Sequence, residues 1–239
     1  MYKRAIILAG GRGTRMRPYT VVLPKPLMPL GEYPILEVIL RQLVKAGFEH
    51  ITMAVNHQAE IIKAFFQNGE RWGVRIDYSL EKQPLGTMAP LQLIKDLPEN
   101  FLVMNGDILT NLDFSSFYED HISVDSIFSI SSVTRHHQIN YGVLETDELG
   151  VLTSFKEKPE VTYKVSMGVY MMNRDVMNFI PKDRPYGFDN LMIDLLSYKK
   201  NPVVRHFDGY WLDIGRPDDY QKAIELFREE EEKFLGVNI

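Results

Sequence analysis

The chain has 239 residues, of which 45% are hydrophobic and 25% charged, and its formal net charge at pH 7 is −5. This composition is typical of a globular protein, and the acidic balance argues against a basic face that binds nucleic acid. The absence of cysteine excludes disulfides and cysteine-ligated zinc. No segment approaches the length of a membrane span, and the apolar run at residues 5–9 is too short for a signal peptide. We therefore expect a cytoplasmic protein without a membrane or nucleic-acid partner.

Short apolar runs alternate with helical periodicity over the first hundred residues. The expected strands are 5–8, 51–55, 74–78 and 101–104, and the expected helices are 35–46, 60–66 and 89–95. The helix over 35–46 has apolar residues at helical spacing and is followed by Gly47, a typical end signal. This alternation predicts βαβ units, and hence an α/β fold with a Rossmann-like, three-layer α/β/α arrangement around a mostly parallel sheet.

The second half of the chain has a different character. Strands are expected over 126–133, 141–145, 151–155 and 165–172, and helices return at 190–198 and 217–235. Turns separate these strands, with few helices between them, which indicates an antiparallel addition to the same sheet or a lid beside it. No linker and no internal repeat is visible. We therefore expect one domain over residues 1–239, with a mixed central sheet and a small antiparallel sub-lobe.

The first 31 residues contain six basic side chains and no Asp or Glu, although the chain as a whole is acidic. Within them, the first predicted strand runs directly into the glycine-rich segment GGRGTR, residues 10–15. Ligands of open α/β sheets bind at the carboxyl ends of the strands. Glycines let backbone N–H groups approach an anion, and arginines grip phosphate oxygens in bidentate fashion. The pattern therefore predicts a polyphosphate site from which carboxylates are kept away.

Two common glycine-rich motifs do not fit this segment. A P-loop requires Gly-Lys-Ser/Thr at its end, which is absent here. A dinucleotide-binding fingerprint requires a third glycine, and the chain has Met16 at that position. Both hypotheses are excluded.

The longer segment LAGGRGTRMRPYTVVLPKPLMPLG, residues 8–31, resembles the signature of the sugar-1-phosphate nucleotidyltransferases (NDP-sugar pyrophosphorylases). The family form reads roughly L-A-G-G-x-G-T-R-L-x-P-x-T-x-x-x-P-K-P-L-x-P, and the main departure is Met16 for Leu. The resemblance implies that Arg15 holds the triphosphate in the transition state and that Lys25 reaches its α-phosphate, which makes both catalytic. A structural turn with surface arginines is the alternative, which so many matching positions disfavour. The residues expected to wrap the nucleotide are Leu8, Ala9, Gly10, Gly11, Arg12, Gly13 and Thr14.

A second segment, SLEKQPLGTMAP, residues 79–90, resembles the family's E-x-x-P-L-G-T element, which reads the base. Gln83 can both donate and accept hydrogen bonds at a base edge. Where many relatives have two small residues after Thr87, this chain has Met88 and Ala89, which leaves the choice of base open. The residues expected at the base are Gln83, Pro84, Gly86 and Thr87.

Two aspartates are candidates for metal binding. Asp107 follows the strand over 101–104, and Asp213 lies in GYWLDIGRP, which resembles the family's W-x-D-I-G-x-P segment. Carboxylate and phosphate oxygens are the ligands that Mg²⁺ prefers. Each aspartate alone could be a strand-end or capping residue. The resemblance implies that both hold Mg²⁺ and that Asp107 also belongs to the catalytic group.

The sugar phosphate is expected to bind in the second half of the chain. Tyr141-Gly142-Val143 resembles the family's Y-G-V segment, and FKEKP, residues 155–159, contains its E-K-P element. Alone, the E-K pair would suggest an exposed hairpin with alternating charges. The resemblance implies that Glu157 accepts hydrogen bonds from sugar hydroxyls and that Lys158 pairs with the sugar phosphate. The residues assigned to this partner are Asn105, Gly142, Glu157, Lys158 and Gly168.

The reaction implied by the resemblance is nucleotidyl transfer. A sugar 1-phosphate oxygen attacks the α-phosphorus of a nucleoside triphosphate in line, and pyrophosphate leaves. The nucleophile is already anionic near neutral pH, so no general base is required, and none of the motifs contains histidine. Residues of about 1–110 would form the nucleotide-binding half and about 111–220 the sugar-phosphate half. No hexapeptide repeat of the kind found in longer relatives is visible, and a homo-oligomer remains open.

The best substrate match is GTP with mannose-1-phosphate or a heptose-1-phosphate, while thymidylyl, uridylyl or cytidylyl transfer to glucose-1-phosphate or a related sugar stays open. A glycosyltransferase would share the sheet and a metal-binding carboxylate, but it would not need the arginine and lysine of the opening segment. A non-catalytic subunit that senses NDP-sugar would be expected to lose Arg15, Lys25 or Asp107, and all three are present. A scaffold would leave the phosphate chemistry unexplained.

Overall fold

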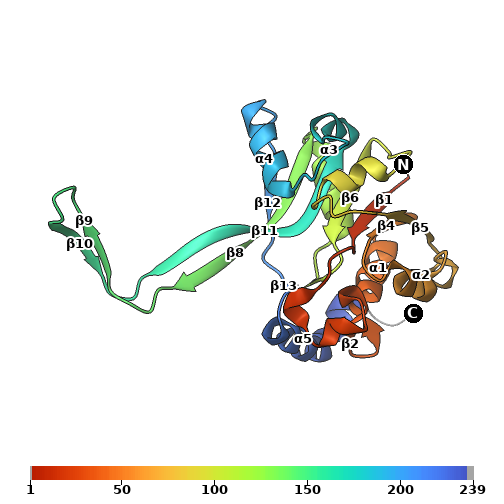
Figure 1. Cartoon of the computed structure of the whole chain (residues 1–239), viewed down its shortest axis with the longest axis horizontal. Coiled ribbons are helices and arrows are strands. Elements are labelled where there is room, and N and C mark those ends of the chain that lie inside the picture. The colour runs from red at the N-terminus through yellow and green to blue at the C-terminus, as the bar shows by residue number, and fades with distance from the viewer. Residues whose placement is uncertain (1, 236–239) are drawn as a thin grey trace.

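The fold is seen in a computed structural model that describes residues 2–235, so that Met1 and residues 236–239 of the expected single domain lie outside the described residues. At its centre is a seven-stranded sheet in the order β12-β8-β11-β6-β1-β4-β5 (Figure 1). The strands of this sheet are β1 (Arg4–Leu8), β4 (His50–Val55), β5 (Arg75–Leu80), β6 (Asn100–Asn105), β8 (Phe128–Gln138), β11 (Glu160–Asn173) and β12 (Val203–His206).

Strand direction confirms the predicted mixed, mostly parallel sheet. β1 pairs in parallel with β4 and β6, and β4 pairs in parallel with β5. β11 runs antiparallel to both of its neighbours, β6 and β8, and β12 is parallel to β8. Within this sheet, β11 is therefore reversed relative to the other strands.

Two hydrophobic cores lie on opposite faces of the sheet and make the predicted three-layer α/β/α arrangement. Along β1, Ala5 and Ile7 belong to one core and Ile6 to the other, as the two-residue repeat of a strand requires. The first core is covered by α1 (Ile35–Lys45), α2 (Ala59–Phe66), α3 (Phe114–Ser123) and α5 (Pro217–Leu235). The second is covered by α4 (Phe188–Ser197) and two 3₁₀ segments, η5 (Ala89–Leu93) and η6 (Arg174–Phe179).

The helix expected over 89–95 is wrong in type, because the structure has only the short 3₁₀ segment η5 there. The backbone N–H groups of Met88 and Ala89 donate to Tyr186 O instead of starting an α-helix. Leu91 N then donates to Met88 O, which is the i to i−3 pattern of a 3₁₀ turn.

Helix α3 was not expected from the sequence, although signals for it are present. Asp113 caps its first turn, accepting hydrogen bonds from the N–H groups of Ser115 and Ser116 at 3.0 Å each. Its buried residues, Phe114, Phe117, Tyr118 and His121, have helical spacing.

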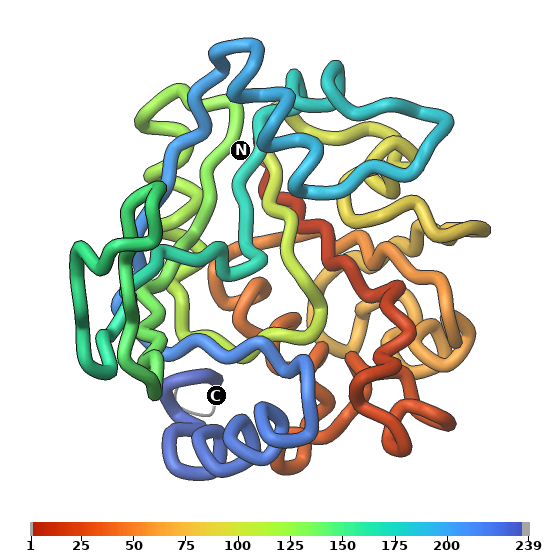
Figure 2. The backbone as a smooth tube through the Cα atoms, turned by 60° about the vertical axis from the view of Figure 1, so that its left-hand side comes forward, coloured from red at the N-terminus to blue at the C-terminus, as the bar shows by residue number. Residues whose placement is uncertain are grey.

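The expected antiparallel addition continues directly from two strands of the central sheet. Beyond the sheet, β8 and β11 continue together as a two-stranded ribbon that ends in the hairpin β9 (Val143–Thr146) and β10 (Leu152–Lys156). We call residues 134–166 the arm. It points away from the rest of the molecule along the longest axis, and Figure 2 shows the same segment after a turn of the view (Figures 1 and 2).

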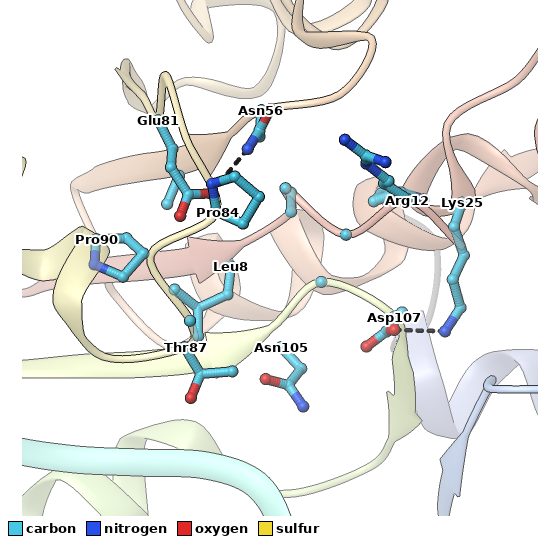
Figure 3. Close-up of a pocket in the computed structure, with 17 residues that line it drawn as sticks. Leu8, Arg12, Lys25, Asn56, Glu81, Pro84, Thr87, Pro90, Asn105 and Asp107 are labelled. Atoms are coloured by element: carbon cyan, nitrogen blue, oxygen red, sulfur yellow. Dashed lines mark hydrogen bonds and ion pairs between the residues drawn. The ribbon is translucent and has the colours of Figure 1, made fainter. Parts of the chain in front are cut away.

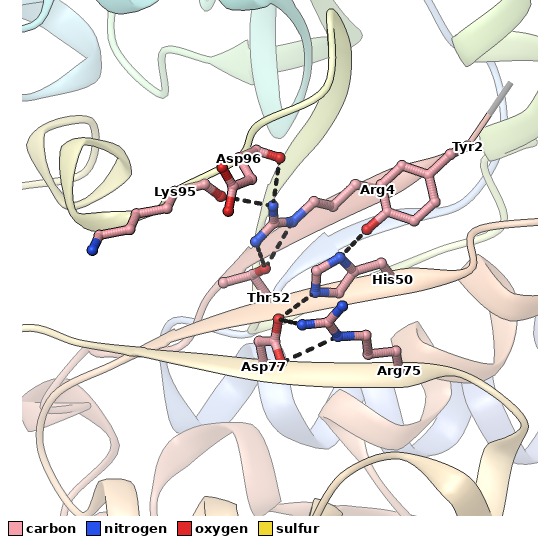
Figure 4. A network of polar contacts seen from close by, with 8 residues as sticks. All are labelled: Tyr2, Arg4, His50, Thr52, Arg75, Asp77, Lys95 and Asp96. Carbon is pink, nitrogen blue, oxygen red and sulfur yellow. Dashed lines mark hydrogen bonds and ion pairs between the residues drawn. The ribbon is translucent and has the colours of Figure 1, made fainter.

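A polar network that includes Arg4 lies at the amino-terminal ends of the parallel strands (Figure 4). Its guanidinium donates to Thr52 Oγ1 at 2.7 and 3.0 Å and to the carbonyl oxygens of Lys95 and Asp96 at 3.0 and 3.1 Å. Lys3, beside it, contacts the ring of Tyr118. Two of the six basic residues in the opening segment therefore stabilise the edge opposite the glycine-rich turn and do not belong to a phosphate site.

Within residues 2–235, no helix combines the length and apolar character needed to cross a membrane.

Candidate active site

A cavity of about 420 Å³ opens at the carboxyl ends of the parallel strands, where β4 and β6 flank β1 (Figure 3). The chain order reverses at this point of the sheet, which is where open α/β sheets bind ligands. Segments that directly follow β1, β4, β5 and β6 form its walls. The lining residues are Leu8, Ala9, Gly10, Gly11, Arg12, Lys25, Pro26, Ala54, Asn56, Glu81, Pro84, Gly86, Thr87, Pro90, Asn105, Gly106 and Asp107.

The glycine-rich loop is fixed by its own local contacts. Gly13 has a φ of +58°, and a Cβ there would lie 2.9 Å from Thr20 Cγ2, so only glycine fits well. Thr20 Oγ1 donates to Gly13 O at 2.7 Å. The single 3₁₀ turn η1 (Thr14–Met16) follows and is anchored by the buried Met16. Thr14 and Arg15, on the same turn, remain exposed on a rigid support.

Lys25 is the buried cation of the site. It begins the 3₁₀ turn η3 (Lys25–Leu27), and 7% of its surface is exposed. Its ammonium forms an ion pair with Asp107 Oδ2, as the dashed line in Figure 3 shows. Asp107 comes two residues after β6 ends. The predicted lysine and aspartate, 82 positions apart in the chain, therefore meet at one side of the cavity.

Asp213 joins this pair through a short antiparallel ladder. It ends β13 (Trp211–Asp213), which pairs with β7 (Ile108–Thr110), and Ile214 N donates to Asp107 O at 3.0 Å. Burial raises the pKa of the Asp213 carboxyl, and the negative charge of Asp107 raises it further, while Lys25 and Arg15 lower it.

Arg15 lies near Asp213. A Cβ built at Gly215 would lie 3.5 Å from Arg15 Nη2 and 3.4 Å from Asp213 Oδ2. The structure thus brings together the three predicted catalytic residues and both predicted metal ligands, in a cluster of two cations and two carboxylates. Arg15 and Asp213 stand at its edge and do not line the cavity itself.

The two carboxylates suit a hard divalent cation. Asp107 directly precedes β7 and Asp213 ends its partner β13, and the pKa of Asp213 is raised by burial and by the charge of Asp107. A bound cation would relieve this repulsion. No group of three or more His, Cys, Asp or Glu side chains within residues 2–235 could form a closed metal cage. Such a pair leaves positions for phosphate oxygens and water, which is how proteins commonly hold Mg²⁺.

A carboxylate on the far wall was missed by the sequence reasoning. Glu81 follows β5 directly, accepts hydrogen bonds from Asn56 Nδ2 at 3.1 Å and from Leu85 N, and faces the cavity (Figure 3). Asn56 in turn follows β4. The position of both residues at a strand's carboxyl end was a signal that could have found them. Gln83, which was expected to read the base, is exposed and does not line the cavity.

Of the other residues predicted to contact the nucleotide, some line the cavity and some do not. Pro84, Gly86 and Thr87 line the cavity, and Thr87 Oγ1 accepts a hydrogen bond from Phe188 N at 2.9 Å, which ties the loop to α4. Gly13 and Thr14 lie beside the cavity without lining it.

The predicted sugar-phosphate residues fall into two groups. Asn105 lines the cavity and packs on Gly168, where a Cβ would lie 2.5 Å from Asn105 Nδ2. Gly142, Glu157 and Lys158 are exposed on the arm and are absent from the cavity lining. The chain as a single molecule therefore does not bring this second group to the cluster.

The fold and the site together define an α/β protein with a glycine-rich loop, two cationic side chains and a pair of carboxylates at the switch point of its sheet. Comparison with known proteins agrees with this class. The sequence profile of the nucleotidyl transferase family matches residues 4–230. The chain belongs to this nucleotidyl transferase family.

Curated relatives are similar over most of this chain. It is 33% identical to a UTP–glucose-1-phosphate uridylyltransferase of Synechocystis sp., with 92% of this chain and 62% of that protein covered. It is also 33% identical to the mannose-1-phosphate guanylyltransferase catalytic subunit beta of Drosophila pseudoobscura, with 94% and 62% covered. The chain thus spans a little over three fifths of the length of these relatives.

Solved structures share the fold. HddC from Yersinia pseudotuberculosis, in complex with GMP-PN, is 28% identical and has a TM-score of 0.70, with 95% of this chain and 100% of that chain covered. A Bacillus anthracis protein described as a glucose-1-phosphate thymidylyltransferase has a TM-score of 0.77 over 99% of this chain and 97% of that chain, at 21% identity. The latter supports the fold alone.

Proposed function

We propose that this chain transfers a nucleotidyl group from a nucleoside triphosphate to a sugar 1-phosphate and releases pyrophosphate. The observation that carries the proposal is the convergence of Arg15, Lys25, Asp107 and Asp213 beside a cavity lined by the glycine-rich loop. Few activities need two cations and two carboxylates around an anion-binding loop. Transfer at a phosphorus atom between two highly negative substrates is one that does.

In this reaction, the protein contributes mainly by positioning the substrates and stabilising negative charge, and less by proton transfer. The sugar phosphate oxygen is already an anion near neutral pH, and none of the residues that line the cavity is histidine. Holding two polyanions in line for attack removes much of the barrier by itself. Arg15 would bind the triphosphate oxygens that gain charge as the leaving pyrophosphate departs.

In the absence of substrate, Lys25 is paired with Asp107. The ion pair gives the buried ammonium a partner at the side of the cavity. When a triphosphate enters, Lys25 can exchange its carboxylate partner for an oxygen of the α-phosphate, which leaves Asp107 free to bind a cation. Asp107 and Asp213 would then hold Mg²⁺, which supplies charge neutralisation at the α-phosphate.

Guanine is the base that we propose. The Glu81 carboxylate faces the cavity, and an ionised carboxylate only accepts hydrogen bonds. Guanine presents two adjacent donors, N1–H and the 2-amino group, which match one carboxylate, whereas uracil and thymine present one donor on that edge. A purine also fills more of the cavity between Leu8 and Pro90 than a pyrimidine does (Figure 3). Uridylyl, thymidylyl and cytidylyl transfer remain the competing outcomes of the test below.

The sugar phosphate is assigned to the remaining predicted residues. Asn105, beside Gly168, would orient the sugar at the cavity wall, while Glu157 and Lys158 would bind its hydroxyls and phosphate. Mannose-1-phosphate or a heptose-1-phosphate is the proposed acceptor, and the activity is proposed to be cytoplasmic because both substrates are metabolites of that compartment.

The test is pyrophosphate release with Mg²⁺ across a grid of five nucleoside triphosphates and a panel of sugar 1-phosphates. The proposal expects signal with GTP and one of the two acceptors. Signal in a different cell of the grid would keep the reaction and correct the substrates. No release from folded protein that still binds a nucleotide would reject the activity and favour a regulatory, NDP-sugar-sensing role.

A further inference from the structure

The arm has no core of its own. None of residues 134–166 is buried, although the segment carries many large apolar side chains. A two-stranded hairpin with nothing covering it is marginally stable in water, and exposed apolar surface of this kind marks an interaction site. The exposed apolar side chains therefore indicate that the arm packs against another surface. Its most exposed apolar residues, with exposed fractions, are Tyr141 (79%), Leu144 (63%), Leu149 (90%), Val151 (60%) and Phe155 (58%).

The polar contacts at the tip of the arm are internal to it. Lys156 pairs with Glu145 at 3.3 Å, and Lys158 N donates to Tyr141 O at 3.3 Å. The cavity, in contrast, is lined only by residues between Leu8 and Asp107. In one chain, Glu157 and Lys158, which are proposed to bind the sugar phosphate, are thus absent from the cavity that is proposed to bind the triphosphate.

The arm is a regular ribbon that contacts the body at its root. Its two strands keep an unbroken antiparallel register from Val133 opposite Val165 to Gln138 opposite Glu160. At the root, the Arg135 guanidinium lies 4.7 Å from the centre of the Trp211 ring, and Trp211 Nε1 donates to the carbonyl oxygen of Met167 at 2.9 Å. Swinging the arm onto its own cavity would carry the ladder along but would separate Arg135 from Trp211, so this contact favours the outward course of the arm.

We propose that the arm of one chain reaches the cleft of a second copy, so that Glu157 and Lys158 of each chain complete the site of the other. This inference rests on the proposed function, because it needs both substrates in one place. A two-fold arrangement provides the same arm-to-cleft contact twice and closes the assembly as a dimer. It also covers the apolar face of each arm, which a single chain leaves exposed.

The rim of the cleft offers a surface that complements the arm. Val21 and Val22, on the loop between the glycine-rich turn and Lys25, are 59% and 77% exposed. The turn at the tip of the arm, TDELG over 146–150, is acidic and contains the exposed Leu149. Beside Val21 is a second hollow, lined by Arg12, Arg17, Thr20, Val21 and His57, which makes the rim basic as well as apolar. The acidic, apolar tip of the arm is therefore complementary to this rim.

The test is complementation between two variants, each inactive alone, which restore an intact site only if each arm serves the other chain of the dimer. Arg15→Ala chains and Lys158→Ala chains are co-expressed with different tags, and hybrids are isolated by purification on both tags in turn. If the arms are exchanged, one site of the hybrid has both defects and the other has neither. The hybrid then shows about half of the wild-type activity at limiting sugar phosphate, while each parent alone is nearly inactive. If each arm serves its own chain, both sites carry one defect and no activity returns.

Three further results would also overturn the inference. They are failure of the two chains to co-purify, wild-type activity of the Lys158→Ala parent, and a monomeric wild type in light scattering at assay concentration. A readout without catalysis is the mass of a Tyr141→Asp, Phe155→Asp double variant, which we expect to be a monomer while the wild type is a dimer. A wild type that is dimeric but inert across the whole substrate grid would reject the proposed function alone, so the two failures are distinguishable.

Discussion

Arg15 is placed so that its charge can be removed with little effect on folding. Its side chain is exposed, and the turn that carries it is held by other residues, namely Gly13, Thr20 and the buried Met16. Surface substitutions away from such anchors usually change the free energy of unfolding by less than about 0.5 kcal/mol. A loss of activity in an Arg15 variant would therefore report on the site and not on the fold.

Arg15→Ala is expected to lower kcat/KM by about 10³-fold, since loss of a guanidinium that binds transition-state phosphate oxygens typically costs this much. Steady-state kinetics with the substrates found in the grid would measure it, together with the melting temperature. Arg71→Ala is the matched control, because Arg71 is also an exposed arginine but lines neither the cavity nor the second hollow. Near-normal turnover of Arg15→Ala would remove it from the catalytic group.

Glu81→Gln should alter the choice of base. Replacing the carboxylate removes a charged acceptor, and hydrogen bonds to charged groups contribute about 1.5–3 kcal/mol, so kcat/KM for GTP should fall roughly 10- to 100-fold. The value for UTP should change much less. Gln83→Ala, on the exposed part of the same loop, is the control and should leave both values near wild type. An equal loss with every nucleotide would show that Glu81 supports the loop and does not read the base.

At the scale of elements, the irregularity in β11 links the sheet to the site. The pairing of β11 with β8 shifts register between Ser166 and Tyr170, and Gly168 lies inside this bulge with a φ of +75°. Bulges of this kind re-aim side chains next to active sites. Here the bulge makes room for Asn105, the last residue of β6.

Gly168→Ala is expected to displace Asn105, because the new Cβ would meet its amide and the backbone conformation disfavours a side chain. A non-glycine residue in such a conformation costs about 1–3 kcal/mol of stability. Urea unfolding would measure that loss, and kinetics should show a higher KM for the sugar phosphate with a smaller change for the nucleotide. Gly73→Ala, also at positive φ and in open space but away from the arm, is the control for backbone strain alone. A Gly168 variant with unchanged sugar-phosphate KM would contradict the link.

A buried histidine between α3 and β8 makes stability depend on pH. His121 is 1% exposed, its Nδ1 is 2.8 Å from Ser129 Oγ, and its Nε2 has no hydrogen-bond partner among the described residues. Burial lowers its pKa from 6.5 to about 4. The folded state therefore favours the neutral ring, and the unfolded chain binds more protons between these two pH values.

His121 therefore lowers the free energy of unfolding in acid. Its stabilising contribution is fully present above pH 6.5 and is lost as the pH falls toward about 4, a loss of about 3 kcal/mol in all. Urea unfolding of the wild type and of His121→Asn, between pH 7 and pH 4, would isolate it, since other groups titrate in both proteins. The wild type should lose more stability over this range. Parallel pH curves would mean that His121 is neutral in both states or is reached by water.

The elements themselves were largely predictable, and the errors have local causes. The strongly periodic segment around Leu40 and the short apolar runs gave the right helices and strands of the first half. The 89–95 segment failed because the carbonyl of Tyr186, nearly a hundred residues away, takes the N–H groups that would start a helix. Such tertiary hydrogen bonds leave no periodic signal. The cap at Asp113 was readable and was overlooked.

At the scale of the whole molecule, the sheet order explains how distant motifs form one site. Motifs around Arg15, Asp107 and Asp213 meet because β1 and β6 are neighbours and β13 pairs with β7. The order of the motifs in the sequence was enough to assign them to one family, and strand-end positions were enough to expect a shared edge. Pairing partners, and therefore the contact between Asp107 and Lys25, were not readable from spacing.

The course of the arm could not be predicted from the sequence. Alternating apolar and polar residues look alike in a strand that stays in a sheet and in one that leaves it. The sequence therefore placed Glu157 and Lys158 near the sugar by resemblance, while the structure places them on a ribbon that extends from the body (Figure 1). In the arrangement that we propose, the arm of a second chain completes the site.

The most direct test of the central claim follows the phosphorus atoms of the nucleotide. GTP labelled with ³²P at either the α or the γ position is incubated with Mg²⁺ and mannose-1-phosphate or a heptose-1-phosphate, and the products are separated. The account predicts that the α label appears in the NDP-sugar and the γ label in pyrophosphate, and that Arg15→Ala abolishes both. A γ label on the sugar phosphate, or an α label that remains in free GDP or GMP, would show phosphoryl transfer or hydrolysis and would contradict nucleotidyl transfer.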